Sequence, residues 1–162
     1  ERDVWDDPAE NGALWRGEAR VEGPPASLGS KRIGRTRDGK PLILDVKDAG
    51  LRSWQDAMRA SMRQTAPQEP LLGPVKVTLA IILQRPKSHF RTGKHAGLLK
   101  PDAPNWHTSK PDADKILRAC LDCGTGIWWR DDSQCAKQHV TKTYVYSDEV
   151  GMVRIWAEEM ER

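Results

Sequence analysis

The chain has 162 residues, the length of one domain that can bury a hydrophobic core. Apolar residues make up 38% and charged residues 30%, so we expect much of the surface to be solvated or to bind a charged partner. No apolar run of membrane-spanning length and no secretory signal is found, so no membrane partner is expected. Three cysteines, an odd number, argue against a disulfide framework and predict a reducing, cytoplasmic location.

The net charge is only +3, but charges are unevenly distributed along the chain. Residues 1–11 are acidic and are predicted to form a flexible end, which leaves 12–162 as a single domain. Lys31–Lys40 holds five basic residues against one acid, and Arg85–Lys110 holds six Lys or Arg and three His against one acid. Basic segments on either side of an acidic centre are typical of a phosphate-backbone binder, with two solvated loops as the alternative.

The first half of the domain is predicted to contain three strands and one helix. Alternation predicts a half-buried strand over Trp15–Val21, and an apolar run predicts a short strand over Pro41–Val46. Between them, Lys31–Lys40 is predicted to be a loop, which we interpret as a DNA-contacting arm. Asp48–Thr65 predicts a helix, and Val75–Leu83 shows the clearest strand alternation. The apolar stripe of the helix is expected to pack in the core and consists of Leu51, Trp54, Met58 and Met62.

Arg85–Lys110 follows this last strand directly and is predicted to be a long loop that forms one wall of a site. At about 25 residues it is longer than ordinary connections, and loops of this length are usually functional or disordered. Its histidines either contact phosphates or are solvated.

A second helix is predicted to begin at Asp112 and Asp114. Pro111 blocks helix before it, Asp112 is a candidate N-cap, and the first turn around Asp114 favours negative charge. Gly124 ends the helix. Its buried face is predicted from the helical spacing of Ala113, Ile116, Leu117, Cys120 and Leu121.

The C-terminal strands His139–Tyr146 and Val150–Ala157 are predicted to form a hairpin through Ser147–Glu149. The resulting order is β, β, α, β, α, β, β. It predicts an α+β domain with a mixed or antiparallel sheet and two principal helices.

Two more acids, Asp131 and Asp132, follow the second helix after the apolar anchor Ile127–Trp129. Each acidic pair alone is typical of a helix start or a turn. Together they indicate a hard cation such as Mg²⁺, because Mg²⁺ prefers carboxylate oxygens and serves phosphodiester displacement.

The combined pattern KPDADK…DDSQ resembles the signature of the RusA family of Holliday junction resolvases, which are Mg²⁺-dependent endonucleases of bacteria and their phages. Asp112 and Asp114 match the family's D-x-D pair, and Asp132 matches its third acid. Arg118 falls where some members have a catalytic lysine. Lys115 departs from the family's usual Asn. The segments Arg85–Lys94 and Ser27–Pro41, outside this signature, also look like family segments.

The resemblance implies a RusA-like fold and a homodimer in a bacterial or phage-infected cell. It implies paired symmetrical nicks across four-way or branched DNA in recombination or repair. Mg²⁺, with Mn²⁺ as a substitute, is expected on Asp112, Asp114 and Asp132. Arg118 either stabilises the phosphate charge or pairs with Asp114. DNA contacts are expected from the basic segments, at Lys31, Arg32, Arg35, Arg37, Arg85, Lys87, Arg91, Lys94 and Lys110.

Two other functions compete with this prediction. A non-catalytic branched-DNA-binding protein of the same fold would bind without cutting, although all three acids are present. A zinc-stabilised interaction module would use Cys120, Cys123, Cys135 and His139, which have zinc-like spacing. Cys120 lies on the apolar stripe, so a core role for the thiols is favoured.

Overall fold

The structure, a computed structural model, describes residues 15–26, 32–35, 37–38, 40–44, 49–147 and 149–161; of 32–35, 41–44 and 49 it describes the backbone only. The predicted flexible end at 1–11 lies outside these residues. The strands are β1 (Arg16–Glu22), β2 (Arg32–Arg35), β3 (Pro41–Leu44), β4 (Val75–Leu83), β5 (Lys137–Tyr144) and β6 (Met152–Glu159). The helices are α1 (Ala49–Arg63) and α2 (Ala113–Gly124), with short 3-10 turns η1 (Lys87–His89), η2 (Gly93–His95) and η3 (Asp132–Gln134).

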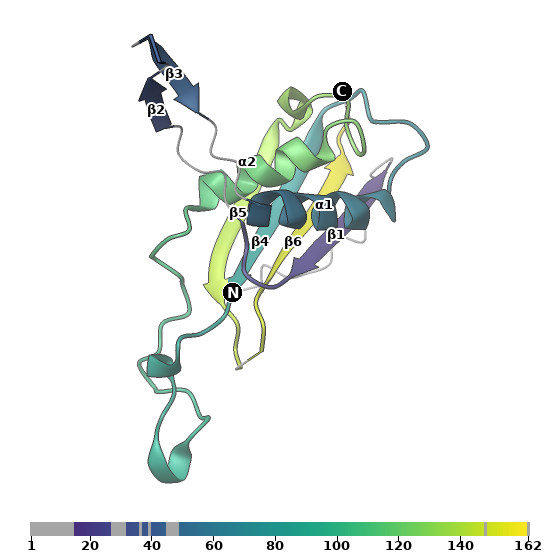
Figure 1. The fold of residues 1–162 in the computed structure, drawn as a ribbon. Coiled ribbons are helices and arrows are strands. Elements are labelled where there is room, and N and C mark those ends of the chain that lie inside the picture. Colours follow the sequence, from purple (N-terminus) through teal and green to yellow (C-terminus); the bar gives the residue numbers. More distant parts are fainter. Residues whose placement is uncertain are drawn as a thin grey trace.

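Four strands form one mixed sheet in the order β1-β6-β4-β5. β4 pairs with β5 in parallel and with β6 antiparallel, and β6 pairs antiparallel with β1. Both α1 and α2 lie on the same face of this sheet (Figure 1). The predicted α+β class with a mixed sheet and two principal helices is therefore confirmed.

β4 lies at the centre of the hydrophobic core. Its alternate residues Val77, Leu79 and Ile81 are fully buried under the helices. The predicted apolar stripe of α1 is confirmed, since Met58 and Met62 are also fully buried in this core. Burial of alternating strand residues against a helical stripe follows from the two side-chain periods of strand and helix.

The predicted hairpin between β5 and β6 is wrong, because β4 lies between them. A strand in this position satisfies its backbone N–H and C=O groups on both edges. The chain crosses the end of β4 at Gly151, where a side chain would collide with the backbone of Ile82 and Gln84. The connection 145–151 can reach about 23 Å when extended, well beyond the roughly 10 Å that separates strands two apart.

The basic segment Lys31–Lys40 was predicted to be a loop, but part of it forms a strand. β2 pairs antiparallel with β3 in a separate two-stranded sheet. This hairpin projects from the four-stranded sheet on the side where α2 begins (Figure 1). β2 is only four residues long and reads Arg-Ile-Gly-Arg, which is too short and too polar for alternation to stand out.

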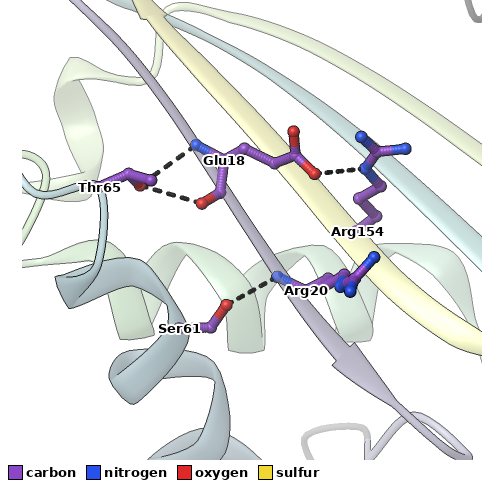
Figure 2. A network of polar contacts seen from close by, with 5 residues as sticks. All are labelled: Glu18, Arg20, Ser61, Thr65 and Arg154. Atoms are coloured by element: carbon purple, nitrogen blue, oxygen red, sulfur yellow. Dashed lines mark hydrogen bonds and ion pairs between the residues drawn. The ribbon is translucent and has the colours of Figure 1, made fainter.

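β1 is an edge strand whose outer side is capped by hydroxyl groups from α1 and the turn after it. Thr65 Oγ1 donates to the Glu18 carbonyl at 3.0 Å and accepts from its N–H at 3.3 Å. Ser61 Oγ accepts from the Arg20 N–H at 3.0 Å (Figure 2). These hydroxyls replace a neighbouring strand and so protect the edge from strand addition.

The long segment after β4 runs away from the sheet as an arm and returns to the start of α2 (Figure 1). At its root, a bridge joins Trp106 to Thr143, so the returning chain pairs with the outer side of β5. Within the arm, Phe90 and Leu99 form an antiparallel bridge. Across the described ranges, no helix has both the length and the apolar character needed to cross a membrane.

Candidate active site

The N-terminus of α2 presents two carboxylates to solvent. Asp112 occupies the N-cap position with extended backbone, but its side chain makes no capping hydrogen bond. Asp114 is exposed in the first turn. A free N-terminal turn also carries unpaired N–H groups and the positive end of the helix dipole, which attract anions. This end of the helix can therefore hold a cation on its side chains and a phosphate near its backbone.

Lys115 pairs with the first of these carboxylates. Its Nζ lies 3.0 Å from Asp112 Oδ2. This contact lowers the pKa of the Asp112 carboxyl, first through the hydrogen bond and then through the positive charge. Lys115, the residue after the D-x-D pair, therefore contacts Asp112 directly, and Asp112 is ionised at neutral pH.

Lys142 of β5 fixes the turn that leads into α2. Its Nζ donates to the Ser109 carbonyl at 2.6 Å and to the Pro111 carbonyl at 2.9 Å. Lys142 was not among the predicted site residues. The signal in the sequence is its spacing, because Lys142 alternates with Val140 and Tyr144 and so shares their face of the strand. A lysine on that face indicates a specific acceptor.

Arg118 is exposed one turn after Asp114. Among the ion pairs of the described side chains, none joins these two residues. The alternative interpretation of Arg118 as a salt-bridge partner of Asp114 is therefore not supported. Its guanidinium remains available to a bound anion.

Asp131 and Asp132 differ in role although they are adjacent. The Asp131 side chain accepts from the Ser133 N–H at 2.9 Å, and its own N–H donates to Gln134 Oε1 at 2.9 Å, which is a capping box. The hydrogen bonds from Ser133 lower the pKa of Asp131. Asp132 is exposed and makes no such contact, so its carboxylate is the free one.

Gln134 and a tryptophan pair tie this turn to the core. Gln134 Nε2 donates to the carbonyls of Leu71 and Gly73 at 2.8 and 2.9 Å. Trp128 and Trp129 are fully buried, and Trp129 packs so closely on Gly124 that a side chain there would collide with the indole. Gly124 therefore ends α2 and also leaves room for the Trp129 ring. The packing of this ring holds the chain that leads to Asp131 and Asp132 against the end of the helix.

The structure does not gather the three predicted acids into one group. Within the part of the chain that it describes, no set of three or more His, Cys, Asp or Glu side chains is placed to hold a metal ion. Asp112 and Asp114 remain together at the start of α2, whereas Asp132 lies on η3. Two carboxylates fit Mg²⁺ when substrate phosphates and water complete its shell.

The thiols of the zinc-like pattern are core residues. Cys120 and Cys123 are fully buried, and Cys123 Sγ donates to the Gln55 carbonyl at 3.7 Å. Burial raises the pKa of Cys123 to about 11, and burial with the nearby Asp132 charge raises that of Cys135 to about 12. Among the described side chains these thiols do not form a group with His139 that could hold a metal ion, which disfavours the zinc module.

Comparison with known proteins adds the family. The model for "Endodeoxyribonuclease RusA" matches residues 22–155, which is most of the chain. The chain belongs to the RusA family. The uncharacterized protein YqaN of Bacillus subtilis (strain 168) is 30% identical over 129 residues, which cover 76% of this chain and 84% of that protein.

The resemblance to the RusA family found in the sequence is thus confirmed, and the matched span includes Asp112, Asp114 and Asp132. Members of the RusA family are nucleases of branched DNA. Membership therefore assigns nuclease activity on DNA to this chain at the level of the family.

The basic residues expected to contact DNA in this RusA family member differ in what the structure shows of them. Exposed side chains that remain candidates are Arg37, Lys87, Lys94 and Lys110, with Arg91 half-buried. Lys31 lies outside the described residues, as do the side chains of Arg32 and Arg35.

Arg85 was also expected to contact DNA, but its side chain is buried and is used within the protein. Arg85 is 5% exposed, and its guanidinium donates to the Val145 carbonyl and, at 2.7 Å, to the Pro104 carbonyl. The group also lies 5.3 Å from the centre of the Tyr144 ring. A buried arginine of this kind is retained by its acceptors, so Arg85 anchors the root of the arm.

Two of the arm's histidines also belong to this anchor. The rings of His89 and His107 each pack 4.8 Å from the Tyr144 ring. Burial and then the Lys142 charge lower the pKa of His107, which favours the neutral imidazole. His95 is exposed near the tip of the arm and remains a candidate for phosphate contact.

Proposed function

We propose that the protein is an Mg²⁺-dependent endonuclease that resolves four-way DNA junctions by paired symmetrical nicks, in recombination or repair. The observation that carries this proposal is the pair of solvent-accessible carboxylates at the N-terminus of α2, with Asp114 exposed and Asp112 half-buried. The projecting hairpin β2–β3 and the basic arm both lie on the side of the molecule where α2 begins, which suits a branched, anionic substrate (Figure 1).

Asp112 and Asp114 would hold Mg²⁺, or Mn²⁺ in its place, together with phosphate oxygens of the substrate, and Asp132 would supply the third carboxylate of the family. A bound ion of this kind activates water and neutralises charge on the phosphate. The N–H groups at the start of α2 bind a phosphate oxygen. Arg118 stabilises the negative charge that develops on the phosphorus centre.

Lys142 holds the turn before α2, so that the carboxylates do not have to be ordered when DNA binds. Paired nicks require two active sites. We therefore propose a homodimer in which each protomer supplies one site.

The test is cleavage of an end-labelled mobile four-way junction, against linear duplex, with Mg²⁺ and with EDTA. We expect symmetrical, metal-dependent cuts confined to the junction. Asp114→Asn should abolish cleavage and retain or strengthen junction binding, because one repelling charge disappears. Binding without cleavage by the wild type would instead favour a non-catalytic branched-DNA-binding protein.

The neighbours Asp131 and Asp132 offer a matched control in the same assay. Asp132→Asn should lower cleavage at least 100-fold if its free carboxylate is used in the reaction. Asp131→Asn should leave cleavage within a few-fold, because asparagine caps a helical turn nearly as well as aspartate. Equal losses in both variants would contradict the assignment of Asp132.

A further inference from the structure

Trp106 is 61% exposed, although the backbone around it is firmly held. Of the tryptophans that the structure describes, it is the exposed one; the others are buried or half-buried. Single exposed apolar side chains are common on proteins and need no explanation. An exposed indole on an ordered backbone is different, because its position has been set before any partner arrives.

The chain before Trp106 is held by the buried arginine of the arm. Arg85 donates to the Pro104 carbonyl at 2.7 Å and to Asn105 Oδ1 at 3.4 Å. The Tyr144 N–H donates to the Asn105 carbonyl at 3.0 Å. Both residues that precede the indole are therefore tied to the root of the arm.

The chain after Trp106 is held by β5. The His107 N–H donates to the Lys142 carbonyl at 3.1 Å. The side chain of the same lysine holds the carbonyls of Ser109 and Pro111. β5 therefore holds the backbone from Trp106 to Asp112 in place. Trp106 keeps a fixed position relative to the N-terminus of α2.

Two lysines flank Trp106 in the sequence of the arm. Lys100 and Lys110 are both exposed. A segment that combines an exposed aromatic ring with cations is typical of sites for single-stranded nucleic acid, where bases stack on the ring and the backbone lies along the positive charge. Bases inside a duplex are covered by their neighbours, whereas bases at a branch point unstack at low cost.

We propose that Trp106 is a stacking platform for an unstacked nucleobase at the branch point of the DNA substrate. This inference rests on the proposed function and names the feature of the substrate that the site recognises. It gives the protein a means of distinguishing branched DNA from linear duplex that does not depend on base sequence.

The experiment measures dissociation constants by fluorescence anisotropy in EDTA, so that no cleavage takes place. The ligands are a four-way junction and a linear duplex made of the same arm sequences. Trp106→Ala should weaken junction binding roughly 5- to 100-fold, the usual loss for one stacked base, and change duplex binding less than about twofold. Trp106→Phe should retain most of the affinity, because it keeps an aromatic face.

Leu72→Ala is the matched control, since Leu72 is 60% exposed and lies before β4 rather than in the arm. It should leave both dissociation constants unchanged. Difference emission spectra between the wild type and Trp106→Phe provide a second readout. Junction DNA should quench the contribution of Trp106, and duplex should not.

Three results with Trp106→Ala would overturn the inference. The first is an equal loss of affinity for junction and duplex, and the second is no loss of affinity for either. The third is a molar mass in light scattering that differs from that of the wild type while junction binding is intact. The last would place the indole in a contact between protein chains. A wild type that prefers the junction but never cuts it contradicts the proposed function and leaves the inference standing. A wild type without any preference contradicts both.

Discussion

At the residue scale, the lysine that directly follows the D-x-D pair has a defined contact with the first of the two acids. Lys115 places an ammonium group 3.0 Å from an Asp112 oxygen. If Asp112 holds the proposed Mg²⁺, the ammonium group and the metal ion would compete for one carboxylate. We expect this protein to need more Mg²⁺ than a variant without the lysine.

Lys115→Asn should lower the Mn²⁺ dissociation constant roughly two- to fivefold, the range expected for an exposed ion pair. The measurement is electron paramagnetic resonance of free Mn²⁺ without DNA, supported by the Mg²⁺ concentration that gives half-maximal cleavage. Lys115→Arg keeps the charge and serves as the control. Unchanged Mn²⁺ affinity in Lys115→Asn would show that the ammonium does not compete.

Residues of similar type that lie close together in the sequence differ in their contacts and burial. Asp131 and Asp132 are neighbours, yet one caps a turn and the other is free. Arg85 and Lys87 are two residues apart, yet one is buried and the other exposed. Such differences depend on which acceptors the fold places nearby, so residue type alone does not decide them.

At the element scale, β1 shows how an edge strand is protected by side chains instead of by another strand. α1 supplies the hydroxyl of Ser61, and the turn after it supplies that of Thr65 (Figure 2). On the open face, Glu18 accepts from Arg154 Nε at 2.6 Å, which joins β1 to β6. The Arg154 guanidinium lies over the Trp156 ring at 4.5 Å.

The contact with Arg154 lowers the pKa of Glu18, so this pair contributes to stability at neutral pH. A depressed carboxyl pKa means that the contribution is present above the unfolded value of 4.5 and is lost as the pH falls through the folded pKa. Because both side chains are about two-fifths exposed, solvent screening limits the gain to about 0.2–1 kcal/mol.

Glu18→Gln should therefore destabilise the protein slightly at pH 7 and have a smaller effect at pH 3. Urea unfolding at the two pH values measures the difference. The control is Glu22→Gln at the exposed end of the same strand, which should change little at either pH. A Glu18→Gln effect that is equal at both pH values would mean that packing, and not charge, is lost.

At the scale of the whole molecule, the arm is anchored at its root and extends into solvent at its tip (Figure 1). Arg85 and β5 hold the root. Towards the tip, the Arg91 N–H donates to the Leu98 carbonyl at 2.8 Å, which closes the outer turn on itself. Folding stability and DNA contact should therefore be separable along this arm.

Replacing 92–97 by two glycines should leave the unfolding temperature within about 2 °C, because the removed residues lie outside the core. It should weaken DNA binding and lower the slope of log K against log salt by about one per lost phosphate contact. Lys94→Ala in the intact arm is the matched control for charge. An unchanged salt slope in both variants would place the DNA contacts elsewhere.

The sequence by itself determined both helices, every strand except β2, and where the acids lie. α1, α2 and β4 were predictable because apolar periods of 3.6 and 2 are local properties of the chain. The start of α2 at its acidic pair was predictable for a similar reason, since a proline and an N-cap residue act on their own turn. The family resemblance followed from the spacing of those acids.

Only the tertiary structure decided which strands are neighbours and which polar side chains are free. Alternation shows that β5 and β6 exist, but backbone hydrogen bonds are the same for every sequence, so it does not show that β4 separates them. Burial of Arg85 and the hydrogen bonds of Lys142 depend on carbonyl groups distant in sequence from each side chain. The acids of the site were readable in the sequence, whereas the contacts that position them arise only on folding.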